Sequence, residues 1–278
     1  MPLSAFSLAL GAAFLHASWN VLIAGARDSE SAAAVATLAG VALLAPVALI
    51  TGGVQTAALP YAGASAVIHV GYLSLLARAY QGGQVSVVYP VSRGTAPVLV
   101  LAFGALLLGE GASVGQVIGV VAVSGGVFLV GARSTGDLER AARRDLLFGA
   151  TIACTIAAYT LVDAEGVDRA HAPAYLFLLL APSSAVYAAA LALGGRGEAM
   201  RAELRPRAFL TGAFVVGAYG CVLAALRLAD AAPVAAVRES SVVIAAFMAA
   251  AFLHERVGPR RAAGAALVLV GVAVIAYA

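Results

Sequence analysis

Two arginines lie inside apolar stretches that are long enough to cross a lipid bilayer, and they are the residues best placed to do chemistry. Arg93 lies in the segment 84–110 and Arg238 in the segment 229–255. A charged side chain at the centre of a spanning helix costs at least about 2.5–3.5 kcal/mol, so it usually faces the protein interior or a water-filled cavity. A guanidinium in a cavity can bind a carboxylate or another anionic group.

Two interpretations of these arginines stay open. Pro90, Gly94 and Pro97 should interrupt the helix around Arg93, which favours a cavity because broken helices at depth are tolerated where they line one. The alternative is snorkelling, because the stretch from Arg93 to Glu110 covers about 25 Å of helix, most of a hydrocarbon core of about 30 Å. In that case both arginines would lie near a membrane interface.

Glu239 is the acidic residue next to Arg238. Neighbouring residues on a helix point about 100° apart, so these two side chains should not face the same way. We expect Glu239 to pair with Arg93 across the interface between the two halves of the chain. A role in taking up a proton from the substrate pathway is the alternative.

Polar and aromatic side chains recur at helical spacing in other apolar segments. His16, Trp19 and Asn20 form one stripe at positions i, i+3 and i+4. We expect such side chains to line a cavity; a membrane-interface aromatic residue or a hydrogen-bonded core histidine is the alternative. The predicted substrate-binding residues are Arg93, Arg238, Glu239, His16, Trp19, Asn20, His69, Tyr72, Tyr159 and Tyr219.

The composition is that of a membrane protein with several spans. Of the 278 residues, 62% are hydrophobic and 11% are charged, and the mean hydropathy is +0.97. The formal charge of +3 concerns orientation in the bilayer rather than nucleic acid. The sequence contains no HExxH, GxSxG or GxxxxGK[ST] motif, so we expect no enzyme activity, catalytic residue, metal or cofactor.

About 20 mainly apolar residues are needed to cross a bilayer, and this length divides the chain into ten predicted helices. We expect a first five-helix repeat at 1–132, a basic cytoplasmic linker at 133–144 and a second five-helix repeat at 145–278. The predicted spans are 3–24, 32–52, 58–80, 84–108, 113–132, 145–165, 172–194, 208–228, 232–253 and 260–278.

The two halves also share residues at a fixed interval. Four pairs are separated by 145 residues (238 − 93 = 145): Arg93 and Arg238, Glu110 and Glu255, Gly119 and Gly264, and Gly126 and Gly271. The glycine faces of the fifth and tenth spans should let helices approach closely. An odd number of spans per half makes the repeats inverted, an arrangement typical of secondary transporters. We expect a central cavity lined by the first, third, fourth, sixth, eighth and ninth spans, and we expect Glu110 and Glu255 to mark membrane interfaces.

The arginines predict the orientation, because cytoplasmic loops keep the basic residues. With both termini outside, only Arg169 and Arg227 fall in outside loops. The inside loops then hold Arg27, Arg78, Arg133, Arg140, Arg143, Arg144, Arg196, Arg201, Arg205, Arg207, Arg256, Arg260 and Arg261.

Four motifs together resemble the drug/metabolite transporter (DMT) superfamily, specifically its EamA-type carriers. They are HASWN at 16–20, VVYPVSRGTAPVLVLAFGALLLGE at 87–110, YTLVD at 159–163 and APVAAVRESSVVIAAFMAAAFLHERV at 232–257. The resemblance implies ten spans in two repeats and ATP-independent transport of small metabolites, often export. Ala235 replaces Pro90 and Glu239 replaces Gly94 in the second repeat, so the two arginine-bearing helices need not bend alike.

We therefore expect a secondary transporter of the inner membrane that exports amino acids or organic acids by alternating access. Its partners would be a small-molecule solute, the lipid bilayer and a coupling proton or ion, without nucleic acid, and the protein would be a monomer or a homodimer. Drug or multidrug efflux and a receptor or scaffold that does not transport are the alternatives.

Overall fold

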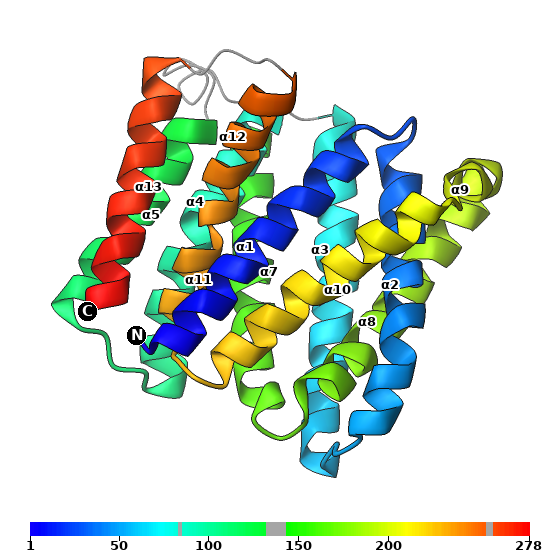
Figure 1. Cartoon of the computed structure of the whole chain (residues 1–278), viewed down its shortest axis with the longest axis horizontal. Helices are drawn as coiled ribbons and strands as arrows, with labels where there is room; N and C mark the ends of the chain where they lie inside the picture. The colour runs from blue at the N-terminus through cyan, green and yellow to red at the C-terminus, as the bar shows by residue number, and fades with distance from the viewer. Residues whose placement is uncertain (83–84, 132–142, 254–257) are drawn as a thin grey trace.

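The computed structural model describes residues 1–82, 85–131, 143–253 and 258–278 (Figure 1). These residues contain ten helical segments that are long and apolar enough to cross a membrane, which confirms the predicted all-helical membrane fold of two inverted five-helix repeats. Glu255 and residues 133–142 of the predicted linker lie outside the described residues.

The first repeat contains α1 (Leu3–Ala24), α2 (Ser29–Thr51), α3 (Leu59–Gly82), α4 (Val85–Phe103) and α5 (Val114–Gly131). The second contains α7 (Arg143–Val167), α8 (Ala172–Leu191), the short α9 (Gly197–Glu203), α10 (Pro206–Leu226), α11 (Ala231–Arg238), α12 (Ser240–Leu253) and α13 (Pro259–Tyr277). A π-helical turn extends α4 to Leu108, and another joins α8 to α9.

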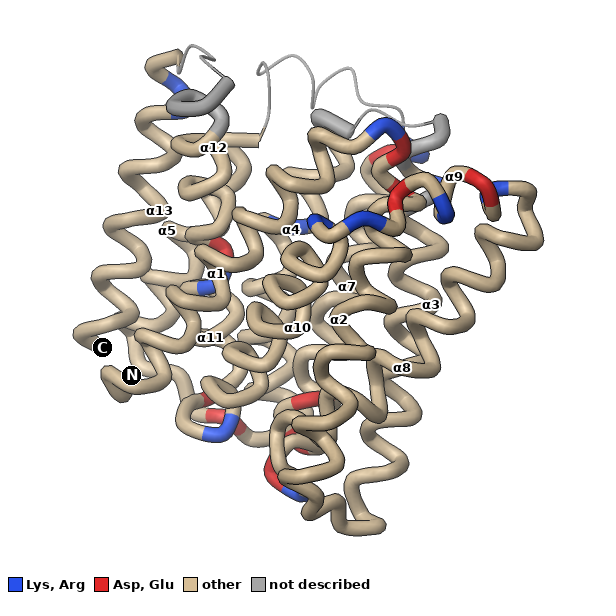
Figure 2. The backbone as a smooth tube through the Cα atoms, turned by 45° about the vertical axis from the view of Figure 1, so that its right-hand side comes forward, with Lys and Arg blue, Asp and Glu red and all other residues tan. Residues whose placement is uncertain are grey.

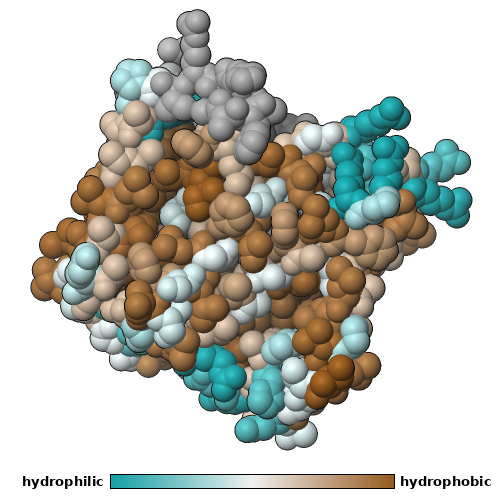
Figure 3. Space-filling model, in the orientation of Figure 1, coloured by the Kyte–Doolittle hydropathy of each residue, from teal (hydrophilic) through white to brown (hydrophobic). Residues whose placement is uncertain are grey.

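The outer surface is suited to lipid. Large apolar side chains such as Leu49, Ile50 and Phe247 are exposed, and Figure 3 shows an apolar face with hydrophilic residues gathered toward its ends. Charged positions gather at the two ends of the helix bundle in Figure 2, with many around α9. Both termini lie at one end of the bundle, opposite to α9 (Figure 1). An even number of spans requires that the two termini share one side.

The repeats pack on each other in matching pairs. Helix α1 packs against α10, and its counterpart α7 packs against α3; α2 packs against α10, and α8 packs against α3. Helices α5 and α13 lie side by side at one edge of the molecule (Figure 1). The third spanning helix of each repeat therefore packs against the first two helices of the other repeat. The centre of the molecule lies between the two repeats.

The predicted helix break around Arg93 is wrong. Helix α4 runs without interruption through Pro90 and Pro97, and the break falls in the second repeat at Glu239, between α11 and α12. There the amide of Glu239 donates to the carbonyl of Ala236, and the amide of Val242 donates to the carbonyl of Glu239, both at 3.0 Å. These i to i+3 bonds tighten the chain into a turn where an α-helix would continue.

Candidate functional site

A cavity of about 390 Å³ lies between the two repeats. Nine of the ten predicted site residues line it, and the tenth, Glu239, is buried directly behind them. The polar and aromatic residues of the lining are His16, Trp19, Asn20, Ser29, Glu30, Thr37, His69, Tyr72, Tyr89, Ser92, Arg93, Tyr159, Ser183, Ser184, Tyr187, Tyr219 and Arg238.

The first helix contributes one face to this cavity. Ala12, His16, Trp19, Asn20 and Ile23 all line it, because residues three or four positions apart lie on the same side of a helix. The rings of His16 and Trp19 meet edge to face with centroids 4.9 Å apart. The stripe predicted from the sequence therefore faces inward.

Arg93 is buried, with 6% of its surface exposed, and this excludes snorkelling to the outer surface. Its Nη2 donates to Nε2 of His16 at 2.9 Å, and its Nε lies 3.3 Å from Oε2 of Glu239. A guanidinium can only donate, so Nε2 of His16 accepts and this ring carries its proton on Nδ1. The predicted ion pair between Arg93 and Glu239 is present, and it joins α4 to the break between α11 and α12.

Arg238 is held differently from Arg93. It is 5% exposed, lines the cavity, and its Nη2 lies 3.8 Å from Oε1 of Glu239. Its Nε and Nη2 atoms have no hydrogen-bond acceptor among the described residues. Arg238 lines the cavity whereas Glu239 does not, so the two side chains face different surroundings although their ends lie within ion-pair distance. Two guanidinium groups thus share one carboxylate, and Arg238 keeps two buried donors without an acceptor among the described residues.

Four rings form an aromatic cluster on the same cavity wall. The ring of His69 lies 4.3 Å from Tyr159 and 5.6 Å from Tyr219, and Tyr72 lies 6.0 Å from Tyr159, measured between centroids. Nδ1 of His69 is 2.8 Å from the carbonyl oxygen of Ser65, which can only accept, so the proton of the neutral ring lies on Nδ1. The cluster offers an apolar surface beside the positive charge of Arg238.

The expected set of lining helices is incomplete. Helices α2 and α8 also line the cavity, through Glu30 and Thr37 on one side and Ser183, Ser184 and Tyr187 on the other. Both helices are largely apolar around their whole circumference, so their inward faces are hard to recognise. The spacing of Ser183 and Tyr187, four residues apart, is the signal that could have identified α8.

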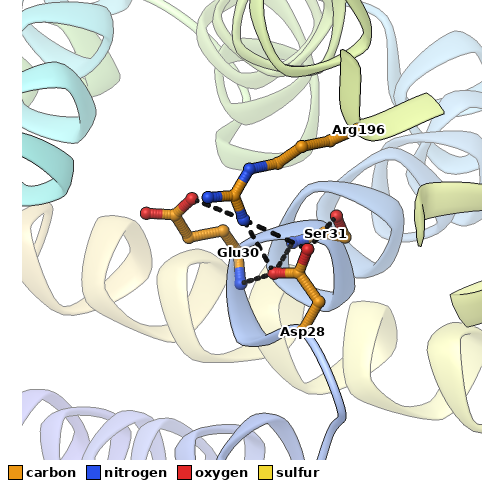
Figure 4. Close-up of polar contacts among 4 residues, drawn as sticks. All are labelled: Asp28, Glu30, Ser31 and Arg196. Atoms are coloured by element: carbon orange, nitrogen blue, oxygen red, sulfur yellow. Dashed lines mark hydrogen bonds and ion pairs between the residues drawn. The ribbon is translucent and has the colours of Figure 1, made fainter. Parts of the chain in front are cut away.

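The end of the cavity near α9 carries a group of ion pairs. Nη1 of Arg196 lies 3.0 Å from Oδ1 of Asp28 and 2.9 Å from Oε2 of Glu30 (Figure 4). Although burial alone would raise the pKa of Asp28, hydrogen bonds from Ser31 and the charge of Arg196 lower it overall. The lining reaches exposed residues at this end, among them Asn20 and Ser29.

The opposite end is closed by backbone contacts between connections of the two repeats. The amide of Gln55 donates to the carbonyl of Arg169 at 3.2 Å, and the amide of His171 donates to the carbonyl of Gly53 at 3.3 Å. The guanidinium of Arg169 also lies 4.7 Å from the ring centroid of Tyr61. Near α9, the connection between α1 and α2 meets the connection that follows α8. At the opposite end, the connection between α7 and α8 meets the connection that follows α2.

Glu110, which was expected to mark a membrane interface, also makes a contact between the two repeats. Its Oε1 accepts a hydrogen bond from the amide of Ala231 at 3.3 Å, so the carboxylate of the first repeat caps the first turn of α11 in the second. An acidic group at a helix N-terminus is favourable. Burial is the main cause that raises the pKa of Glu110, and the charges of Asp230 and Glu165 raise it further against the effect of the Ala231 bond.

Inverted repeats, apolar outer faces and a charged central cavity define a membrane protein of the transporter class. Both halves of the chain match the model of the EamA-like transporter family, at residues 3–132 and 144–277, and the chain belongs to this family. It is thus a DMT-type transporter, in a family whose members are transporters rather than enzymes.

The other comparisons give information on the fold alone. No curated protein matches the chain. A solved structure described as "Crystal structure of protein" is similar over 98% of both chains, with a TM-score of 0.75 and 17% sequence identity. This likeness supports the helix arrangement and carries no information on the solute.

Proposed function

We propose that this transporter is a secondary carrier, located in the inner membrane with both termini outside, that exports small metabolites bearing a carboxylate. The observation that carries the proposal is the guanidinium of Arg238, a residue of the cavity wall whose Nε and Nη2 atoms are buried without a hydrogen-bond acceptor among the described residues. A buried donor without a partner is costly, so an anionic solute that supplies one gains affinity.

The charge balance favours an anion. Arg93 and Arg238 face the single carboxylate of Glu239, so this group has a formal charge of +1 when all three are ionised. Glu239 lies nearer to Arg93, which leaves Arg238 as the residue to receive the solute. Amino acids and organic acids have a suitable carboxylate, and the aromatic cluster can contact their apolar portion.

The cavity is accessible from the end that we assign to the cytoplasm, which supports binding of the solute from that side. The cavity lining reaches exposed residues near α9, at the arginine-rich end, while backbone contacts between the repeats close the other end. Alternating access would exchange these two arrangements by moving one repeat against the other. The backbone contacts that join the two repeats at the closed end are then one gate, which must open to release the solute.

A screen of amino acids and organic acids for thermal stabilisation of the purified protein tests the proposal, because a ligand that binds the folded state raises the apparent Tm. We expect carboxylates to stabilise the wild-type protein and to lose this effect in Arg238→Gln. Stabilisation by amide or ester analogues equal to that of the parent acids would contradict a carboxylate site.

Drug efflux is a second candidate, because much of the cavity wall is apolar, including Leu73, Ile152, Ile156 and Val222. A lipophilic cation would meet the positive charge of Arg238, which opposes its binding. The resistance profile of an overexpressing strain separates the candidates: drug efflux predicts raised resistance to lipophilic drugs, and metabolite export predicts none.

A further inference from the structure

Asp163 is a buried carboxylate behind the cavity that the proposed solute site does not use. It lies on α7 with none of its surface exposed. The groups that act on it are neutral or titratable: His69 and Ser65 on α3, Tyr175 on α8 and Tyr219 on α10. The buried Glu239, by contrast, is paired with Arg93.

The hydrogen bonds of Asp163 suit both of its protonation states. The hydroxyl of Tyr175 donates to Oδ1 at 2.9 Å, and the hydroxyl of Tyr219 donates to Oδ2. When the carboxylate gains a proton, either phenol oxygen can accept a hydrogen bond from it, because a tyrosine hydroxyl both donates and accepts. Protonation would also remove a charge from a buried position that forms no ion pair with an arginine of the described residues.

Two rings connect this carboxylate to the cavity. Tyr219 and His69 both line the cavity, and their centroids are 5.6 Å apart. Because Nδ1 of His69 is bonded to Ser65, its Nε2 carries the lone pair that can accept a proton. A proton arriving in the cavity can therefore reach Asp163 through the hydroxyl of Tyr219, which is bonded to its carboxylate, while His69 can hold a proton beside Tyr219.

The same two rings line the cavity together with Arg238. We propose that Asp163 is a proton-binding site, linked through Tyr219 and His69 to occupancy of the Arg238 site, so that proton and anionic solute favour each other's binding. An anion that neutralises the charge of Arg238 lowers the cost of adding a proton at the neighbouring rings and at Asp163, and linkage makes this effect reciprocal. The coupling to solute rests on the proposed function, whereas proton binding by Asp163 does not.

Infrared difference spectroscopy of the full-length protein in lipid tests the proton site without any solute. On lowering the pH, we expect a carbonyl stretch of a protonated carboxylic acid that the wild type shares with the control Glu110→Gln and that Asp163→Asn lacks; the band of Glu110 itself is the one that Glu110→Gln removes. Tyr219→Phe keeps the carboxylate and removes one hydrogen bond, so the band should move. A band that persists in Asp163→Asn, or that stays in place in Tyr219→Phe, would overturn the assignment.

Benzoate is a suitable probe for the linkage, because it joins a carboxylate to a ring. We expect its affinity to rise about fivefold or more as the pH falls through the titration of the band, and this dependence to disappear in Asp163→Asn. Wild-type benzoate affinity that stays constant across that titration would overturn the linkage while leaving the solute site intact. Loss of carboxylate binding at every pH would instead reject the proposed function and leave the infrared result standing.

Discussion

Gly126 on α5 and Gly264 on α13 face each other so closely that a Cβ atom on Gly126 would lie 2.7 Å from the carbonyl oxygen of Gly264, and the reverse contact would be 2.8 Å. Gly119 and Gly271 repeat the relationship at 2.9 and 2.7 Å. By the interval of 145 residues, Gly126 corresponds to Gly271 and Gly119 to Gly264. Each glycine of α5 therefore meets the counterpart of the other glycine of α5. Such reciprocity is expected when a two-fold axis relates two inverted repeats.

We expect Gly126→Ala to destabilise the protein by about 1–3 kcal/mol, because the added methyl group would meet backbone atoms that cannot easily yield. Gly125→Ala is the matched control, since a Cβ there would meet only Leu267 at 3.6 Å, an ordinary contact. Thermal unfolding of both variants in detergent measures the difference. Equal melting temperatures would show that α5 and α13 do not approach as described.

Replacing Arg93 should lower the stability of the protein, whereas replacing Arg238 should not. Arg93→Ala leaves the buried Glu239 without its nearer partner, which costs about 3–5 kcal/mol for a buried ion pair. Arg238→Gln removes a buried charge that has free donors, so the protein without solute should be as stable as the wild type or more stable. Melting temperatures without solute distinguish the two residues, and a larger loss for Arg238→Gln would contradict their assigned roles.

Glu110 should act through its hydrogen bond rather than through its charge. Glu110→Ala removes the cap of α11 and should cost about 0.5–2 kcal/mol, whereas Glu110→Gln keeps an oxygen that can accept from Ala231. Because the folded-state pKa of Glu110 is raised, its stabilising contribution is complete below the unfolded value of about 4.3 and declines as the pH rises through the folded value.

The stability of the wild type should therefore fall relative to that of Glu110→Gln as the pH rises from about 4 toward neutral. Chemical unfolding at a series of pH values measures this difference. A difference that stays constant over this range would mean that the surroundings of Glu110 in the folded protein do not disfavour its charged form.

The ion pairs at the α9 end should be weak and sensitive to acid. Arg196→Ala should destabilise by about 1 kcal/mol or less at neutral pH, because these side chains are partly exposed. Since the pKa of Asp28 is lowered in the folded protein, its contribution is present above the unfolded value of about 3.9 and is lost as the pH falls through the lower folded value. Arg201→Ala, on the exposed side of α9, is the control and should show no loss in that range.

The sequence predicts the helices and the arginine cluster well, for physical reasons that are local. A charge in an apolar segment needs a partner, so Arg93, Arg238 and Glu239 could be expected together. The stripe of His16, Trp19 and Asn20 has helical spacing, which makes its inward direction readable.

Other features depend on contacts that spacing does not reveal. Pro90 and Pro97 indicated a break in α4, yet the chain breaks at Glu239, where a buried ion pair and a tight turn occur without proline. In the sequence, Asp163 is close only to residues of its own helix such as Tyr159, whereas its hydrogen-bond partners come from α8 and α10. The role of a residue whose partners lie on distant helices can be recognised only in the structure.

Efflux of a preloaded, labelled carboxylate from proteoliposomes without ATP tests the central claim most directly. The acid that best stabilises the wild type in the screen is the solute for this measurement, and Gly125→Ala is the control for reconstitution. We expect flux in the wild type and in this control, and none above empty liposomes in Arg238→Gln. Wild-type flux that is unchanged in a folded Arg238→Gln variant, or no wild-type flux of a solute that binds, would contradict the account.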